Sequence, residues 1–246
     1  MAHLDDYADR YQHVAFERRE GVLEVRLHTG GGPLVWSPTA HRELADAYAD
    51  IAGDPETKVV VLTGTGDSFI ASMDTAAFIA DGASWDRIWW EGKRLLTNLI
   101  DIDVPVIGVV NGPATVHAEM AVMSDVVLAA DTAVFADAPH FAYGTVPGDG
   151  VHVVWENLLG TNRGRYFLLT AQTIDAAEAH RLGVVNEIHP AGVVLDRAHE
   201  IARGFTTRPL SVLRYTRAAL TMRLRRMLLD GLSHGLALEG CGTMRP

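Results

Sequence analysis

Residues 59–64 read Val-Val-Val-Leu-Thr-Gly, and residues 106–110 read Val-Ile-Gly-Val-Val. Uninterrupted β-branched runs of this length are typical of strands that are covered on both faces, as in a parallel sheet. Between the two runs, apolar residues recur at helical spacing from Trp85 to Leu99, and Ser84 precedes them as an N-cap. Strand–helix–strand units of this size imply right-handed crossovers, so this stretch predicts an α/β layered core.

The flanking segments extend this core. Residues 14–18 and 22–28 alternate in hydrophobicity around Glu20-Gly21 and predict a β-hairpin. Residues 41–51 have a helical pattern, and residues 126–130 form a third buried run. We therefore predict one core domain over residues 1–195.

Length and composition limit the possible functions. The chain has 246 residues, of which 48% are hydrophobic, and this is enough for one globular domain with a sizeable core. Its 21 Lys and Arg against 31 Asp and Glu give a net charge of −10, which opposes binding to nucleic acid. The single cysteine, Cys241, excludes an internal disulfide, and no stretch has the pattern of a secretory signal or of a membrane span. We expect a cytoplasmic protein with neither a nucleic-acid nor a membrane partner.

The C-terminal part of the sequence has a helical pattern throughout. Residues 201–229 contain seven arginines and no acidic residue, and Leu220, Leu224 and Leu228 belong to an apolar stripe. We interpret residues 196–246 as a helical arm that packs on the core or on a neighbouring subunit. A nucleic-acid contact is the alternative, but the arginines are not interleaved with aromatic residues and the rest of the chain is acidic.

Common catalytic motifs are absent from the sequence. Gly64-Thr65-Gly66 follows a predicted strand, but Phe69 stands where a dinucleotide-binding motif requires its third glycine. There is no phosphate loop, His-Glu-x-x-His motif or serine elbow. His117, His140 and His152 lack the spacing of metal ligands, so we expect no metal site.

Residues 137–150 predict a loop of defined shape, because glycine and proline are frequent there and a helix follows near Gly150. Such a loop can bring His140 and Asp149 to one pocket. A carboxylate beside a histidine fixes its tautomer and stabilises the imidazolium that forms when the ring takes a proton. A solvated histidine without a catalytic role is the alternative, and the spacing leaves both readings open.

Several stretches, in order, resemble the crotonase superfamily of enoyl-CoA hydratases and isomerases. The resemblance extends over about residues 12–215 and is carried by residues 59–69, 105–114, 124–131, 144–148 and 168–187. It implies a fold of the α/β class, a crotonase-like spiral of ββα units with a C-terminal helical region. It also implies a homotrimer or a dimer of trimers.

The chain departs from the family pattern at positions where the family carries its chemistry. Val116-His117-Ala118 stands where members that act on acyl-CoA have a run of glycines, and His140 stands where hydratases have a catalytic glutamate. A glycine in such a loop lets backbone and substrate approach closely, whereas a histidine fills the space and supplies a side-chain donor. Glu119 is the candidate for the other hydratase glutamate.

The chain is similar to one branch of the superfamily, the β-diketone hydrolases of the 6-oxocamphor hydrolase type. Residues 34–41 (Leu-Val-Trp-Ser-Pro-Thr-Ala-His), the spacing of His140 and Asp149, and residues 235–239 (Gly-Leu-Ala-Leu-Glu) carry this likeness. It implies that water cleaves a C–C bond of a cyclic 1,3-diketone, with His140 and Asp149 as the general-base couple. No metal or organic cofactor is then required, because the second carbonyl of the substrate accepts the electrons.

The same resemblance implies roles for five other residues. Trp36, His41 and His117 are candidate donors to the oxyanion and the enolate that develop during cleavage. Glu239 is a candidate catalytic carboxylate, and Phe78 is a candidate apolar wall. Structural readings stand beside these: Trp36 as a core aromatic, His41 as a solvated side chain and Glu239 as an exposed residue near the terminus.

Two other functions stay open. An acyl-CoA hydratase or isomerase needs a thioester carbonyl between two backbone N–H groups and an acid/base glutamate, and His117 and His140 argue against both. A non-enzymatic scaffold or an RNA-binding module would use the arginine-rich arm, and it would not need Trp, His and Asp residues to converge.

Overall fold

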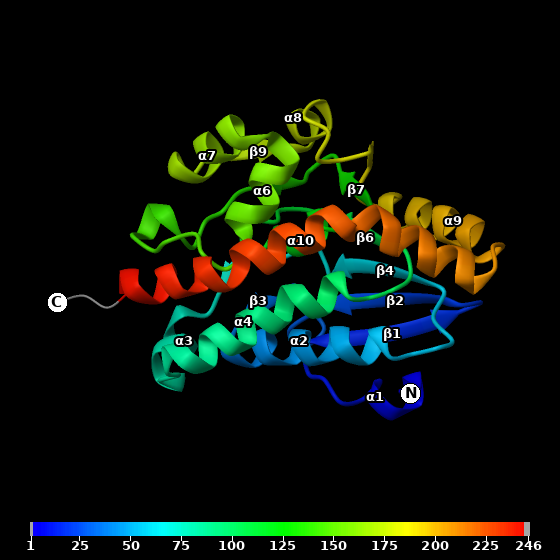
Figure 1. Cartoon of the computed structure of the whole chain (residues 1–246). Coiled ribbons are helices and arrows are strands. Elements are labelled where there is room, and N and C mark those ends of the chain that lie inside the picture. Colours follow the sequence, from blue (N-terminus) through cyan, green and yellow to red (C-terminus); the bar gives the residue numbers. More distant parts are fainter. Residues whose placement is uncertain (1, 244–246) are drawn as a thin grey trace.

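The centre of the computed structural model in Figure 1, which describes residues 2–243, is a six-stranded sheet with the order β1-β2-β4-β6-β7-β10. Its strands are β1 (Val14–Arg19), β2 (Val22–Leu27), β4 (Val59–Gly64), β6 (Val106–Val110), β7 (Val126–Ala130) and β10 (Glu187–His189). β1 and β2 pair antiparallel, and every other neighbouring pair of this sheet is parallel. The predicted hairpin and the three predicted buried strands are therefore confirmed.

Both faces of this sheet are covered, as the β-branched runs predict. Alternate residues of β4 point to different cores: Val60 and Leu62 belong to the larger cluster, whereas Val59 and Val61 belong to a smaller one beneath the helix Val194–Thr206. Figure 1 shows helices on the two sides of the sheet. A strand without a polar face fits only such a layered arrangement.

The helices of the structure are α1 (Leu4–Tyr7), α2 (Pro38–Ala52), α3 (Thr75–Asp81), α4 (Trp85–Ile100), α5 (Glu119–Val122), α6 (Val151–Leu159), α7 (Thr161–Leu169), α8 (Ala176–Arg181), α9 (Val194–Thr206) and α10 (Leu210–Thr243), with a 3₁₀ turn at Phe141–Tyr143. Ser84 caps α4 as predicted, because its side chain accepts a hydrogen bond from the Arg87 N–H. Helix α2 begins earlier than the predicted residue 41, since Ser37 caps it in the same way and Pro38 occupies its first position. His41 therefore lies in the first turn of α2.

Two short sheets align loops that are far apart in the sequence. β3 (Val35–Trp36) pairs parallel with β5 (Ser72–Met73), and β8 (Val134–Phe135) pairs antiparallel with β9 (Ile174–Asp175). Single bridges from Ala114 to Ile70 and to Phe135 connect the segments between them. The ends of these segments meet on one side of the molecule, where the candidate site lies.

The C-terminal helices pack on the rest of the chain. α9 contacts the sheet, and α10 contacts α4 and α6 (Figure 1). The arginine-rich stretch contributes to this packing: buried Arg217 donates to Asp125 at 2.7 Å and to the Ile100 carbonyl at 2.9 Å, which satisfies an acceptor at the end of α4. The predicted boundary between residues 195 and 196 falls within α9, and the division into core and arm stays a prediction. Within residues 2–243, no helix combines the length and the apolar character that crossing a bilayer requires.

Candidate active site

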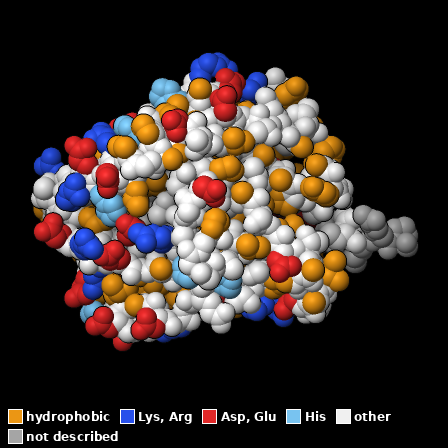
Figure 2. Space-filling view, turned by 180° about the vertical axis from the view of Figure 1, so that it is seen from behind, with side chains coloured by type: hydrophobic (Ala, Val, Ile, Leu, Met, Phe, Trp, Pro, Cys, Tyr) orange, Lys and Arg blue, Asp and Glu red, His pale blue; other side chains and the backbone are white. Residues whose placement is uncertain are grey.

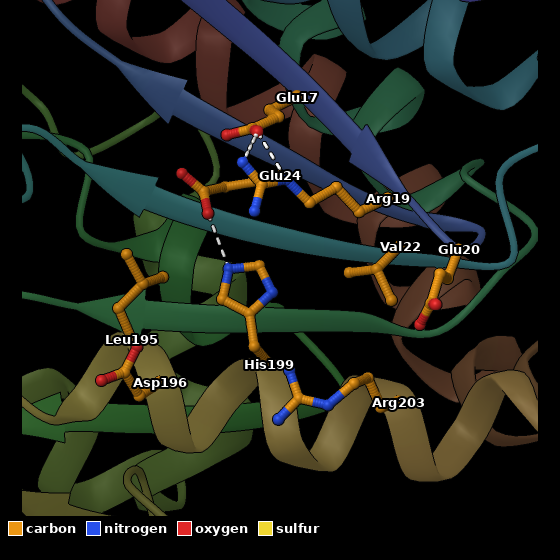
Figure 3. Close-up of a pocket in the computed structure, with 9 residues that line it drawn as sticks. All are labelled: Glu17, Arg19, Glu20, Val22, Glu24, Leu195, Asp196, His199 and Arg203. Atoms are coloured by element: carbon orange, nitrogen blue, oxygen red, sulfur yellow. Dashed lines mark hydrogen bonds and ion pairs between the residues drawn. The ribbon is translucent and has the colours of Figure 1, made fainter.

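The structure has a surface groove and a smaller cavity. The groove, of about 610 Å³, lies between the β1–β2 hairpin and α9 (Figure 3). Four of its charged or titratable side chains form two pairs: His199 Nε2 lies 2.6 Å from Glu24 Oε2, and Arg19 Nε donates to Glu17 at 2.6 Å. Figure 2 shows charged side chains of both signs gathered over this part of the molecule. The one histidine of this groove is therefore held in an ion pair, and the residues that the sequence singled out do not line it.

The smaller cavity, of about 210 Å³, is lined by all the residues that the sequence singled out, namely Trp36, His41, Phe78, His117, His140, Asp149 and Glu239. They come from β3, α2, α3, the loop before α5, the loop before α6 and α10. The rest of the lining is mainly apolar and includes Met73, Ile88, Leu95 and Leu236. An apolar cavity with a few convergent polar groups is the usual form of a small-molecule site. The catalytic roles of the seven residues stay predictions.

His140 lies between two carboxylates. Its Nδ1 is 2.6 Å from Asp137 Oδ1, and its Nε2 is 3.4 Å from Asp149 Oδ2 and 3.9 Å from Glu239 Oε1. Burial opposes a charge on this ring, but Asp149 and Asp137 outweigh it and raise the pKa of His140 to about 12. The sequence brings His140 and Asp149 together correctly, yet the orienting contact at Nδ1 comes from Asp137. Sequence reasoning assigned Asp137 no role, although it lies in the same loop, three residues before His140.

His117 has a backbone conformation that favours glycine. Its φ of +48° lies in the left-handed region, where a residue with a Cβ is strained. The ring stacks on Trp36 with centroids 4.1 Å apart, and its Nδ1 lies 2.7 Å from Glu119 Oε1 and 3.5 Å from Asp149 Oδ2. Burial opposes a charge on the ring, but the two carboxylates raise the pKa of His117 above its usual value. The charged form of an imidazole is therefore favoured at the position where the family resemblance leads one to expect a glycine.

Trp36 fits its structural reading as a core aromatic, whereas Glu239 differs from its own. Trp36 is buried, and it lines the cavity as well as the core. Glu239 is buried instead of exposed, and its Oε2 has no hydrogen-bond partner among the described residues. Burial and the neighbouring Asp149 raise the pKa of Glu239 to about 8. Asp149 itself is half-buried, but the charge on His140 holds its pKa well below the usual range. At neutral pH the cavity therefore contains a protonated and an ionised carboxyl group side by side.

His41 has a carboxylate partner that the sequence gives no means of finding. Its Nδ1 lies 3.2 Å from Oε2 of Glu91, which is on α4 and is buried. Burial lowers the pKa of His41 below its usual value, in spite of the contact with Glu91. The ring of His41 is therefore neutral at neutral pH, in contrast to the rings of His117 and His140.

Two groups of side chains could hold a metal ion. Possible ligand atoms of His117, Glu119 and Asp149, and of His140, Asp149 and Glu239, lie within 4.8 Å of one another. The sequence spacing does not reveal either set, because in each set one member comes from a segment that is distant in the sequence. In each set, imidazole and carboxylate groups already form ion pairs with one another.

Comparison with known proteins defines the class. The family model "Enoyl-CoA hydratase/isomerase" matches residues 17–238. The chain belongs to this family, and it is an enzyme of the crotonase superfamily. Among solved structures it is similar to a β-diketone hydrolase from the cyanobacterium Anabaena sp. PCC 7120 in complex with (S)-3-oxocyclohexyl acetic acid, with 46% identity, a TM-score of 0.94 and 96% of each chain covered.

Other relatives have names that indicate acyl-CoA chemistry. The chain is 31% identical to a carnitinyl-CoA dehydratase of Citrobacter koseri over 190 residues, and these residues cover 76% of this chain and 72% of that protein. It is 28% identical over 227 residues to a probable enoyl-CoA hydratase of Mycobacterium bovis, covering 90% and 86% of the two chains. An enoyl-CoA hydratase/isomerase structure from Mycobacterium paratuberculosis, at 24% identity, 95% and 94% coverage and a TM-score of 0.85, shows the same fold. The predicted crotonase-like fold is thus confirmed.

Proposed function

We propose that the protein is a cofactor-independent hydrolase that cleaves a C–C bond of a cyclic 1,3-diketone by retro-Claisen attack of water, with bicyclic diketones as the first candidates. The observation that carries the proposal is the convergence of His140, Asp149 and His117 with the Trp36 indole in one small cavity. Two departures from the acyl-CoA pattern, His117 and His140, are thereby accounted for by a single chemistry.

The ligand of the Anabaena hydrolase supports this choice of substrate. That protein is bound to (S)-3-oxocyclohexyl acetic acid, a cyclic ketone with a carboxymethyl group. Hydrolytic opening of one C–C bond between the two carbonyls of a bridged bicyclic 1,3-diketone gives a keto acid of this kind. We extend this substrate class to the present chain on the basis of 46% identity and the shared fold.

The proposed reaction balances without a cofactor. The oxygen of water forms a bond to one carbonyl carbon, and the C–C bond on the side of the second carbonyl breaks. The electron pair of that bond moves into the second carbonyl as an enolate, and the proton taken from water returns to the enolate carbon. The product is a carboxylic acid that carries a ketone.

The His140–Asp149 couple is assigned to water activation. Since the pKa of His140 is raised to about 12, the ring is an imidazolium in the free site, with Nε2 facing Asp149. Because the charge on His140 holds the pKa of Asp149 well below its usual range, this carboxylate does not take the Nε2 proton, and Nε2 accepts a proton from water only after the ring has released its own proton to solvent. General-base assistance of this kind is worth about 10²–10⁴ in rate. Asp137 holds the opposite nitrogen and thereby selects Nε2 as the reacting atom.

The two developing negative charges need donors. The Trp36 indole N–H and the charged ring of His117 lie side by side in the cavity and are assigned to the carbonyl oxygens. Each donor that is aimed at a developing charge contributes about 10²–10³ in rate. Glu239, which is protonated below a pH of about 8, is assigned to the return of a proton. The homotrimer or dimer of trimers implied by the family resemblance is part of this proposal.

A substrate panel tests the proposed function. The purified protein is incubated with monocyclic and bicyclic 1,3-diketones, and loss of the diketone and release of acid are followed together. We expect stoichiometric conversion of at least one bicyclic member to a keto acid. The rival activity is tested with crotonyl-CoA, by hydration and by thermal shift. Turnover of the thioester without turnover of any diketone would reject the proposal in favour of an acyl-CoA hydratase.

A further inference from the structure

His41, which lines the cavity, and Glu91, which does not, form a second imidazole–carboxylate pair, and its ring is neutral whereas that of His140 is charged. His41 comes from the first turn of α2 and Glu91 from the middle of α4, and both side chains are less than 10% exposed. Nδ1 of His41 lies 3.2 Å from Oε2 of Glu91, while Nε of Arg87 lies 3.6 Å from Oε1. The negative charge of Glu91 is thus compensated by Arg87 on one side and presented to His41 on the other.

This geometry determines which nitrogen of His41 carries the proton. A carboxylate only accepts hydrogen bonds, so Nδ1 must be the N–H donor. Because burial lowers the pKa of His41, the ring is neutral and has a single N–H. Nε2 is therefore left with a lone pair. Both His41 and Gly92 line the cavity, and Nε2 lies 3.6 Å from the position that a Cβ on Gly92 would occupy. No residue of the described range donates a hydrogen bond to this nitrogen.

An accepting nitrogen has a specific use in this cavity. A 1,3-diketone in its diketo form has two carbonyl acceptors and no O–H or N–H donor, so it cannot use Nε2 of His41. Water is the one reactant that can donate. We propose that Glu91 is a positioning residue that fixes His41 in the Nδ1–H tautomer, and that Nε2 of His41 accepts a hydrogen bond from the attacking water.

The role of His41 toward water rests on the proposed diketone hydrolysis, whereas the tautomer of its ring rests on the structure alone. It replaces the sequence-based expectation that His41 donates to a substrate carbonyl, and it leaves Trp36 and His117 as donors. Two groups then contact one water: His140, through its couple with Asp149, removes one proton, and His41 holds the other. Holding both O–H bonds directs the oxygen lone pair toward the carbonyl carbon, which is a contribution of orientation to the rate.

The tautomer is measured without substrate, by nitrogen-15 NMR of the full-length protein with labelled histidine. We expect the His41 ring to be neutral at pH 7, with Nδ1 protonated and Nε2 bare, and the signal is assigned by its loss in His41→Asn or in His41→Gln. A neutral ring with the proton on Nε2, or an imidazolium at pH 7, overturns the proposal. Because the measurement needs no turnover, failure of the tautomer is distinguishable from failure of the diketone panel.

Kinetics of the Glu91 variants test the role in catalysis. Glu91→Gln keeps an oxygen that accepts from Nδ1, so we expect a loss in kcat below about 10-fold, whereas Glu91→Leu should lose about 100-fold in kcat with KM changed less than about 3-fold. The matched control is Glu200→Leu, at an exposed position of α9, which should retain wild-type kcat. A rise in KM at unchanged kcat would mean that His41 binds the diketone, and this outcome overturns the assignment to water. Equal losses in Glu91→Gln and Glu91→Leu, with folding intact by circular dichroism, also overturn it.

Discussion

His140 and His41 line the same cavity and are buried to a similar extent, but the ring of His140 is positively charged and the ring of His41 is neutral. His140 contacts Asp137 with one nitrogen and Asp149 with the other, and its pKa rises to about 12. His41 contacts one carboxylate, Glu91, and burial lowers its pKa. The desolvation penalty acts on both rings in the same direction, so the number of close carboxylates decides the charge.

This comparison divides the cavity into a charged side and a neutral side. The charged side has His140, Asp149 and, next to Asp149, the ring of His117. The neutral side has His41 and the apolar residues of α4. A reaction in which water loses a proton and two oxygens gain charge needs both kinds of environment. Pairs of titratable groups with pKa values pushed apart by their surroundings are a common property of catalytic sites.

Removal of the charged side should have the largest effect on activity. For His140→Ala and for Asp149→Asn we expect diketone cleavage to fall by about 10³-fold or more, because the water then lacks its base. Initial rates on the best diketone of the panel measure this, and thermal unfolding checks that the fold is intact. His180→Ala, an exposed histidine on α8, is the control and should retain wild-type rates. Near-normal turnover in either cavity variant would remove the distinction between the two sides.

The second carboxylate of His140 offers a smaller and more informative change. Asp137→Asn keeps an oxygen at Nδ1 but removes one of two negative charges, so the pKa of His140 should fall by at least one unit and the rate by about 10-fold. An NMR titration of His140 measures the first effect, with exposed Asp131→Asn as the control. Protonation of His140 also contributes to the stability of the folded protein. Since the pKa of His140 is above its unfolded value of 6.5, the stabilisation is complete below pH 6.5 and is lost as the pH rises toward about 12.

In the variant, this loss should still begin near pH 6.5, because the unfolded pKa is unchanged, but it should end at a lower pH and be smaller in total, and urea unfolding from pH 6 to pH 11 would detect the difference. A His140 titration that is unchanged in Asp137→Asn would mean that Asp149 alone charges the ring.

The pH dependence of Glu239 sharpens the comparison further. Its pKa is raised from 4.5 to about 8, so the neutral form is favoured in the folded protein, and ionisation costs stability as the pH rises from 4.5 to about 8. We expect the wild-type rate to decline above a pH of about 8, because ionised Glu239 repels the developing enolate. In Glu239→Gln this decline of the rate at alkaline pH should be absent. The free energy of unfolding of the variant, taken relative to wild type, should be about 1–3 kcal/mol higher at pH 9 than at pH 5. A rate profile with the same alkaline limb in the variant would assign the limb to another group.

The smallest expected effect is a difference in stability between two variants of His117, and it distinguishes the contribution of the backbone conformation from that of the side chain. His117→Gly and His117→Ala both remove the imidazole, and both should lose diketone cleavage. The φ of +48° is free for glycine and strained for alanine, so the glycine variant should be more stable by about 1 kcal/mol. Urea unfolding of the two variants under identical conditions gives the difference directly. Equal stability would mean that the loop relaxes out of the left-handed conformation when the ring is absent.

Much of the fold could be predicted because burial on both faces leaves a visible pattern. The runs at 59–64, 106–110 and 126–130 have no polar alternation, and each is a strand of the central sheet. The two-residue strands β3, β5, β8 and β9 were not predicted, since so few residues form no periodic pattern and their pairing depends on loops that are distant in the sequence. The start of α2 was missed by three residues, although Ser37-Pro38 is a recognisable signal.

The candidate site was predicted through family resemblance more than through residue chemistry. All seven predicted residues line the cavity, but without the resemblance Trp36, His41 and Glu239 would not have been selected. Glu91 and Asp137 were missed for different reasons. Asp137 is three residues from His140, and a short polar residue in a loop has many possible partners. Glu91 is 50 residues from His41, and the contact exists only because α2 packs on α4.

The sequence by itself determined the layered α/β class, the family and the identity of the side chains that reach the cavity, because strand burial and local motifs are encoded by neighbouring residues. Tertiary structure decided the charge and the tautomer of each imidazole. These properties depend on distances of a few ångström between side chains from separate elements and on their removal from water. Three histidines of the same intrinsic chemistry thereby come to differ, because the pKa is raised at His140 and His117 and lowered at His41.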